Sequence, residues 1–484
     1  MSVSTRRKFL GTSAMGLVAA AAGVGVASEV EGVAAETASP GSDHLPGEIA
    51  CRTTNGTSRF ASTSSPRWKA ASADAATDAI ILNPDKRFQT ILGFGAALTD
   101  AACYVVHQLP AEQREHLLHE LFQPSEMGLS VCRTCIGASD YSTKVYSYDE
   151  GDPDLELQRF SIDQDRAYVL PVLREARKAN PGLFLFSSAW SPPGWMKSGG
   201  SMLGGSMRRR YLGVYAQYLL KFLQAYSAEG VPVQAITVQN EVDTDQDARM
   251  PACIWPQEYE IELVRDHLGP LLEQNGMKTG ILILDHNYNL WGRATCELDD
   301  PAVRRYSNAV AWHGYAGTPE MMSKVHDAHP DAEMFWTEGG PDIVSPDYQT
   351  DWAKWGQTFT AALRNWCRSI TAWNLVLDER GKPNIGPFRC GGVVTIHSKT
   401  KEITRSGQYW ALRHFSQSVQ RGAHRFDSTG AIAGVSHIAF ENPDRTKVAI
   451  VTNQGAARKT SLRMAAMQAD LTLDADSLST FVWS

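Results

Sequence analysis

From about residue 90 onward, short apolar runs alternate with longer amphipathic stretches. The apolar runs predict strands, and the stretches with a 3.6-residue period predict helices between them. The predicted strands cover residues 91–97, 129–136, 183–190, 235–240, 280–285, 309–313, 333–337 and 369–375, and the predicted helices cover 110–122, 163–179, 210–228, 256–275 and 353–368. Such alternation indicates βαβ units and a parallel sheet. Eight strands in a row fit a closed (β/α)8 TIM barrel, an α/β fold, better than an open doubly wound sheet.

The pattern changes near residue 409. One more helix is predicted over 409–421, and residues 434–484 contain short β-rich runs separated by turns. Such runs are typical of a small antiparallel β-sandwich. We therefore expect a barrel over residues 91–422 and a β-sandwich domain formed mainly by the C-terminus, residues 423–484. An N-terminal strand within residues 73–90 is expected to join the sandwich.

The first residues predict a targeting segment and not a part of the folded domain. Arg6 and Arg7 precede a weakly hydrophobic Ala/Gly/Val run that ends in Gly25-Val26-Ala27. Residues 1–27 are therefore predicted to be a twin-arginine export signal, which implies a periplasmic or extracellular protein without stable membrane insertion after signal cleavage. A disordered basic N-terminus is the alternative. Residues 28–72 are rich in Ser, Thr, Gly and Ala and predict a flexible leader.

Composition narrows the classes of function. The 46 Lys and Arg against 53 Asp and Glu give a net charge of −7, which argues against a nucleic-acid or anionic-membrane binder. Cys132-x-x-Cys135 lies in a predicted strand without a second such pair, so we interpret these residues as buried thiols. Gly93-Phe-Gly95 lacks the third glycine of a dinucleotide-binding loop. No cofactor, no metal and no particular oligomeric state are predicted.

Two glutamates end predicted strands. Glu241 follows the strand at 235–240, and Glu338 follows the strand at 333–337. The carboxyl ends of barrel strands meet at one face, where active sites of this fold lie. A carboxylate at the end of a buried strand is unfavourable unless it is hydrogen-bonded or functional. Paired carboxylates across a cleft are what glycoside hydrolysis requires, although structural charges at loop starts are the alternative.

Aromatic residues gather at the same predicted strand ends. Flat indole rings stack on the apolar faces of sugars, whereas core filling is the alternative for any one of them. The aromatic candidates are Trp190, Trp312, His313, Tyr315, Trp336 and Trp373. Asp140 and Asp285-His286 follow other strands and offer hydrogen bonds to sugar hydroxyls, unless they are ordinary loop polar groups. The predicted partner is therefore a carbohydrate or a glycolipid.

Seven stretches of the chain carry a family resemblance. They are GFGAALTD (93–100), RTCIGASDYS (133–142), SSAWSPPGWMKSGG (187–200), TVQNEVD (237–243), AVAWHGYAG (309–317), WTEGG (336–340) and AWNLVLDERGKPN (372–384). In this order they resemble glycoside hydrolase family 30, the glucosylceramidase-like family of retaining (β/α)8 glycosidases. The resemblance runs from about residue 88 to the C-terminus, and it implies a β-sandwich built from both chain ends.

The resemblance also implies residue roles. Glu241 corresponds to the general acid/base, Glu338 to the nucleophile, and Asn240 to the residue that holds the sugar 2-hydroxyl. Arg133 corresponds to the arginine that steadies the nucleophile. The residues implied to line the reacting subsite are Asp140, Trp190, His313, Tyr315 and Trp373.

The expected activity is that of an exported retaining β-glycosidase, glucosylceramidase-like, which cleaves β-glucosidic bonds through a covalent glycosyl-enzyme. β-Xylosidase, β-fucosidase and β-1,6-glucanase activities are alternatives within the family, and an inactive carbohydrate-binding protein is the alternative outside it. Two features depart from the glucosylceramidase branch. Glu338-Gly339-Gly340 stands where that branch has Glu-Ala-Cys, and the loop at 242–250 is polar and acidic.

Overall fold

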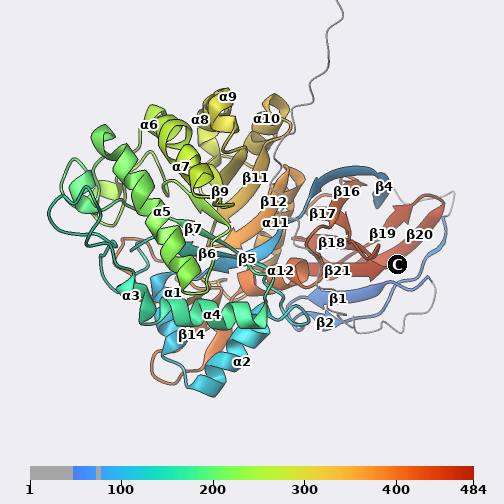
Figure 1. The fold of residues 1–484 in the computed structure, drawn as a ribbon. Coiled ribbons are helices and arrows are strands. Elements are labelled where there is room, and N and C mark those ends of the chain that lie inside the picture. Colours follow the sequence, from blue (N-terminus) through green and yellow to red (C-terminus); the bar gives the residue numbers. More distant parts are fainter. Residues whose placement is uncertain (1–46, 72–77) are drawn as a thin grey trace, which may run out of the picture. The chain divides into compact units, whose positions relative to one another are not determined.

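The computed structural model describes residues 47–71 and 78–484, which are drawn as coloured ribbon in Figure 1. The predicted export signal at 1–27 and the first part of the predicted leader lie outside the described residues. Among the described residues, the helices are too short or too polar to span a membrane.

Eight parallel strands close into a barrel, as the alternating pattern predicts (Figure 1). Each strand pairs with its neighbours in chain order, and the last pairs with the first. The strands are β5 Gly93–Ala97, β6 Val131–Cys135, β7 Phe184–Ser188, β8 Ala235–Thr237, β9 Gly280–Asn287, β10 Ala309–His313, β11 Glu333–Glu338 and β12 Cys367–Ala372. The predicted fold class is confirmed.

Helices connect the barrel strands. They are α1 Asp100–His107, α2 Ala111–Phe122, α3 Asp163–Arg166, α4 Val169–Ala179, α5 Leu212–Ala228, α6 Gln257–Glu262, α7 Gly269–Gln274, α8 Trp291–Leu298, α9 Pro301–Arg304, α10 Glu320–Ala328, α11 Trp352–Arg364 and α12 Gly407–Ser416. The helix predicted at 256–275 is interrupted by a π-helical segment, Leu263–Leu268. Pro270 explains the interruption, because it has no N–H to continue the α-helical hydrogen bonds.

Short 3₁₀ helices and one small sheet complete the loops at the carboxyl ends of the strands. The 3₁₀ helices are Gly194–Met196, Arg209–Tyr211, Gln246–Ala248 and Tyr288–Leu290. The sheet contains β13 Val376–Leu377, β14 Val394–Ile396 and β15 Ile403–Arg405. The sequence pattern predicts none of these elements.

The second domain contains a ten-stranded sheet, with strands from before and after the barrel in the chain (Figure 1). The strand order is β2-β1-β21-β18-β17-β16-β4-β19-β20-β3. The bounds are β1 Ala50–Thr54, β2 Ala61–Ser62, β3 Lys69–Ala70, β4 Ala79–Thr90, β16 His424–Thr429, β17 Val435–Glu441, β18 Lys447–Asn453, β19 Arg458–Met464, β20 Met467–Leu473 and β21 Ser477–Trp483. Ile80 and Leu82 of β4 share a buried core with Phe426 and Phe481, so the N-terminal strand is part of this domain.

The predicted flexible leader at 28–72 is wrong for its described part. Strand β1 pairs with β21 over five residues, and Ile49 just before it is fully buried. The Ser/Thr-rich composition suggests a leader, but Cys51 and Thr53 point inward in alternation with exposed Arg52. This alternation is the period of a half-buried strand, and it is too short to be recognised without its partner.

Alternate residues of the barrel strands point into the barrel. One inward layer is apolar and forms a buried cluster: Val131, Phe186, Ala235, Leu282, Ala311 and Phe335. The next inward residues, two positions further along their strands, are polar: Arg133, Ser188, Thr237, His313 and Thr337. All five are at most 1% exposed. The interior of the barrel therefore has an apolar layer beneath a buried polar layer. The polar layer lies directly under the site at the strand ends.

The two cysteines of Cys132-x-x-Cys135 are both buried, as predicted. All eight cysteines of the chain lie in its described part, where they are free thiols.

Candidate active site

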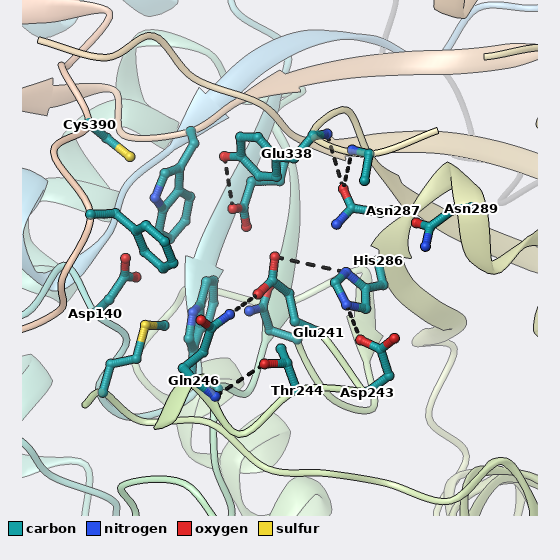
Figure 2. A pocket seen from close by; sticks show the side chains of 17 residues that line it. Asp140, Glu241, Asp243, Thr244, Gln246, His286, Asn287, Asn289, Glu338 and Cys390 are labelled. Carbon is teal, nitrogen blue, oxygen red and sulfur yellow. Dashed lines mark hydrogen bonds and ion pairs between the residues drawn. The ribbon is translucent and has the colours of Figure 1, made fainter. Parts of the chain in front are cut away.

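A cavity of about 480 Å³ lies at the carboxyl ends of the barrel strands (Figure 2). Its lining includes six of the predicted site residues: Asp140, Trp190, Asn240, Glu241, Glu338 and Trp373. Tyr315 also lines it, whereas Arg133 and His313 lie in the buried layer beneath. The structure therefore brings all nine predicted site residues to one place.

Arg133 is the centre of this layer. Its fully buried guanidinium donates to Glu338 Oε2 at 2.5 Å, to Asp285 Oδ2 at 2.7 Å and to Asn240 Oδ1 at 2.8 Å. The Nε–H donates to Ser188 Oγ at 3.0 Å. One side chain from β6 thus fixes groups from β7, β9 and β11 and from the segment after β8. A buried charge of this kind is tolerated because its partners are charged and hydrogen-bonded.

Glu338 ends β11 and carries two different hydrogen bonds. Arg133 binds Oε2, and the hydroxyl of Tyr315 donates to Oε1 at 3.0 Å. Both hydrogen bonds fix the orientation of the carboxylate. The loop that carries Tyr315 is held in place, because the backbone N–H of Tyr315 donates to Asn287 Oδ1 at 3.0 Å.

Glu241 lies just beyond β8 in the left-handed region, with φ of 54°. Its backbone N–H donates to the Asp285 carbonyl at 3.0 Å, and Gln246 Nε2 donates to its Oε2 at 2.7 Å. The Oε1 atom lies 3.4 Å from His313 Nδ1 and 3.8 Å from His286 Nδ1. Burial opposes the charge on Glu241, but its contacts with His313 and His286 lower its pKa below the ordinary value.

His313 links the two glutamates. Its Nδ1 faces Glu241, and its Nε2 lies 3.1 Å from Asp285 Oδ1 and 3.8 Å from Glu338 Oε2. Although burial favours the neutral ring, the charges and hydrogen bonds of Glu338, Asp285 and Glu241 raise the pKa of His313 to about 9. His313 therefore holds a proton close to Glu241 at neutral pH.

Asp285 is fully buried and anchors the layer. It accepts hydrogen bonds at 2.7 Å from the hydroxyls of Thr237 and Thr337. Burial alone would raise its pKa, but Arg133 and His313 hold the pKa well below the ordinary range. The predicted strand end at Asp285 marks it as a candidate in the sequence. Its anchoring role depends on contacts with residues of four other strands, which no local pattern shows.

Asp140 presents a different kind of carboxyl group to the cavity. It is 4% exposed, and its Oδ1 has no hydrogen-bond partner among the described residues. Burial, together with the charges of Glu338 and Glu241, raises its pKa well above the ordinary value. A protonated carboxyl both donates and accepts, so Asp140 is suited to a ligand hydroxyl.

Two of the predicted aromatic residues form the apolar wall. The rings of Trp190 and Trp373 stack with centroids 5.0 Å apart and planes 20° apart. The Arg133 guanidinium lies 4.7 Å from the Trp190 ring centroid and 5.5 Å from that of Trp373. These cation–π contacts hold both indoles in place beside the polar floor of the cavity.

Trp312 and Trp336 do not line the cavity, so both are core residues and not part of the substrate site. Trp312 is fully buried, and its Nε1–H points to Met334 Sδ at 3.2 Å. Trp336 is 1% exposed and packs between Gly314 and Gly339. This packing gives a physical reason for a glycine directly after Glu338: a Cβ on Gly339 would lie 2.3 Å from two atoms of the Trp336 ring.

Replacing Gly339 with alanine is expected to lower the free energy of unfolding by about 1–3 kcal/mol, because the buried indole must move. Gly292 on α8 is the matched control, since a Cβ there meets no atom within 4 Å. Alanine at 292 is expected to preserve stability or raise it by up to about 1 kcal/mol. Urea unfolding of both variants tests this, and equal losses would contradict the packing argument.

Several residues at the mouth of the cavity are not among the predicted site residues. Those labelled in Figure 2 are Asp243, Thr244 and Gln246 after β8, Asn287 at the end of β9, Asn289 after it, and Cys390 in the loop between β13 and β14. Phe388 of the same loop also lines the cavity. The polar loop at 242–250 was noted in the sequence, but its hydrogen bond to Glu241 was not predictable. Phe388 and Cys390 follow no periodic pattern that a sequence argument detects.

A closed barrel whose cavity holds two carboxylates at the strand ends has the arrangement of barrel glycosidases. Residues 91–419 match the family model described as "Glycosyl hydrolase family 30 TIM-barrel domain", and residues 422–481 match "Glycosyl hydrolase family 30 beta sandwich domain". The chain belongs to glycosyl hydrolase family 30 and is a glycosidase, and the family resemblance of its motifs is confirmed.

Relatives within the family carry more than one activity. An endo-1,6-β-D-glucanase of Neurospora crassa is 33% identical over 391 residues, which cover 77% of this chain and 80% of that protein. Putative glucosylceramidase 1 of Caenorhabditis elegans is 28% identical over 396 residues, covering 78% and 76%. A solved endo-β1,6-glucanase structure has a TM-score of 0.82 and 28% identity, covering 90% of this chain and 100% of that chain.

Proposed function

We propose that this protein is a retaining β-glycosidase that hydrolyses β-1,6-linked glucan by double displacement. Glu338 attacks the anomeric carbon and forms a covalent glycosyl-enzyme, while Glu241 donates a proton to the departing glycosidic oxygen. Glu241 then takes a proton from water, which cleaves the intermediate and restores the sugar configuration. Export through the twin-arginine route is part of this proposal, and fractionation of cells that produce the full chain tests it.

The hydrogen bonds of the two glutamates support these roles. Arg133 and Tyr315 hold the carboxylate of Glu338 in one orientation, as a nucleophile requires. Glu241 needs a proton before it acts as an acid, and His313 Nδ1 holds one 3.4 Å from its Oε1. Transfer of that proton to Glu241 leaves a neutral imidazole whose Nε2–H donates to Asp285. Both glutamates contact one imidazole, so the two carboxyl groups belong to one site.

The observation that carries the choice of substrate is the polar mouth of the cavity. Asp243, Thr244, Gln246, Asn287 and Asn289 all line the cavity, and Gln246 contacts Glu241 directly. Amides, hydroxyls and carboxylates bind sugar hydroxyls, whereas the hydrocarbon chains of a ceramide favour apolar contacts. The similarity to the Neurospora crassa endo-1,6-β-D-glucanase points in the same direction.

Glucosylceramide hydrolysis is the second candidate. Met250 and Phe388 add apolar surface to the cavity, and Phe388 is 44% exposed. Similarity to the Caenorhabditis elegans putative glucosylceramidase also favours this candidate.

Hydrolysis rates on a linear β-1,6-glucan, a β-1,3-glucan and detergent-dispersed glucosylceramide test the proposal. The β-1,6-glucan is expected to be cleaved fastest, and NMR of the first product is expected to show the β-anomer. Faster cleavage of glucosylceramide would overturn the glucan assignment, and an α-anomer would overturn retention. Binding of glucan without hydrolysis of any substrate would support the inactive carbohydrate-binding protein instead.

A further inference from the structure

Two buried imidazoles face Glu241 through their Nδ1 atoms. His313 is fully buried and His286 is 6% exposed. The charged partner of both Nδ1 atoms is Glu241 Oε1, at 3.4 Å from His313 and 3.8 Å from His286. Two imidazole nitrogens and one carboxylate oxygen therefore meet at one place.

Both rings are oriented by a carboxylate on their other nitrogen. His286 Nε2 lies 2.5 Å from Asp243 Oδ1, and His313 Nε2 lies 3.1 Å from Asp285 Oδ1. These contacts place the Nε2–H of each ring toward its carboxylate and leave both Nδ1 atoms facing the same oxygen, Glu241 Oε1; Figure 2 shows this contact for His286. A metal ion that binds there replaces the proton on His313 Nδ1. A carboxylate behind each imidazole is the usual outer arrangement of histidines that bind metal ions.

We propose that His286, His313 and Glu241 bind a zinc ion that inhibits the glycosidase. The three ligand atoms lie within 4.8 Å of one another. Tetrahedral zinc, with bonds of about 2.0–2.1 Å, places its ligands about 3.4 Å apart. The Glu241 oxygen is 3.4 Å from one nitrogen and 3.8 Å from the other, so two of the three ligand separations are already close to this value.

The donor set selects the kind of ion. Two imidazole nitrogens and one carboxylate oxygen suit zinc, whereas calcium and magnesium prefer oxygen ligands alone. Glu241 and His286 line the cavity, so a fourth ligand position is open to water. The bound ion occupies the oxygen that exchanges a proton with the glycosidic oxygen, and therefore blocks acid/base catalysis. The hydrolytic reaction itself needs no metal.

The test measures zinc binding in the absence of substrate. Tag-free protein, stripped with EDTA, competes with a chromophoric chelator for added zinc. One tight site is expected in the wild type, and His286→Gln is expected to weaken it at least tenfold. Asp243→Asn removes only the orienting carboxylate of a half-exposed residue, and it is expected to weaken the site about 10–100-fold.

His267→Gln is the matched control, because His267 is partly exposed and lies 3.8 Å from Glu262, away from the cavity. It is expected to keep the tight site. The proposal is overturned if His286→Gln and Asp243→Asn both bind zinc as tightly as the wild type. It is also overturned if His267→Gln loses as much zinc affinity as these two variants do. If His286→Gln does not fold, Asp243→Asn decides. Inhibition by zinc that EDTA reverses would support the inhibitory consequence, and this result is separate from which glucan is cleaved.

Discussion

Replacing Glu338 with glutamine is expected to lower the hydrolysis rate on the order of 10⁴-fold or more, with the fold intact. The amide keeps the shape of the side chain but has no anionic oxygen to attack the anomeric carbon. Arg133 retains Asp285 as a charged partner at 2.7 Å, so its guanidinium is not left unpaired in the buried layer. Steady-state rates on β-1,6-glucan and on an aryl β-glucoside measure the loss.

Glu333→Gln is the control for this variant. Glu333 begins the same strand, β11, but its side chain pairs with Arg368 at the other end of the barrel. This variant is expected to stay within about twofold of the wild-type rate, since a partly exposed ion pair contributes little. Thermal unfolding of both variants separates loss of chemistry from loss of fold. Near-normal turnover in Glu338→Gln would remove Glu338 from the nucleophile role.

The barrel was predictable because its strands are buried on both faces and are separated by long amphipathic helices. β10 begins and ends at the predicted residues, 309 and 313. Short elements were missed for a physical reason. Helix α10 has nine residues and buries only Met322 and Val325, so it shows too few turns for a clear period. Strand β1 was assigned to a leader because its burial depends on β21, which is more than 420 residues away in the chain.

The candidate site likewise contains residues that the sequence predicts and residues that it does not. Glu241 and Glu338 were predictable because parallel strands bring their carboxyl ends together whatever the loops do. Gln246 was not, because its contact with Glu241 depends on three consecutive residues in the left-handed region, with φ of 51–55°. Such a conformation is held by tertiary contacts and not by local preference. These loops line the cavity around the two glutamates. The pattern of strands therefore predicts the position of the glutamates but not the substrate.

Replacing Glu241 with alanine is expected to separate two kinds of substrate. Hydrolysis of β-1,6-glucan, whose leaving alcohol needs a proton, is expected to fall about 10²–10⁴-fold. An aryl β-glucoside with an acidic phenol needs almost no protonation, so its first step is expected to be nearly preserved. Rates on the two substrates, measured side by side, give the ratio. An equal loss on both would contradict the acid role.

Azide distinguishes the acid/base role from a general loss of structure. Removal of the Glu241 carboxylate opens space beside the anomeric carbon, on the face where water attacks the glycosyl-enzyme. Azide enters there without base assistance, so the variant is expected to regain activity on the aryl β-glucoside and to release a β-glycosyl azide. The wild type is expected to show neither effect, because the ionised Glu241 repels the anion. An α-glycosyl azide from the variant would mean attack from the opposite face, and double displacement at Glu338 would then be wrong.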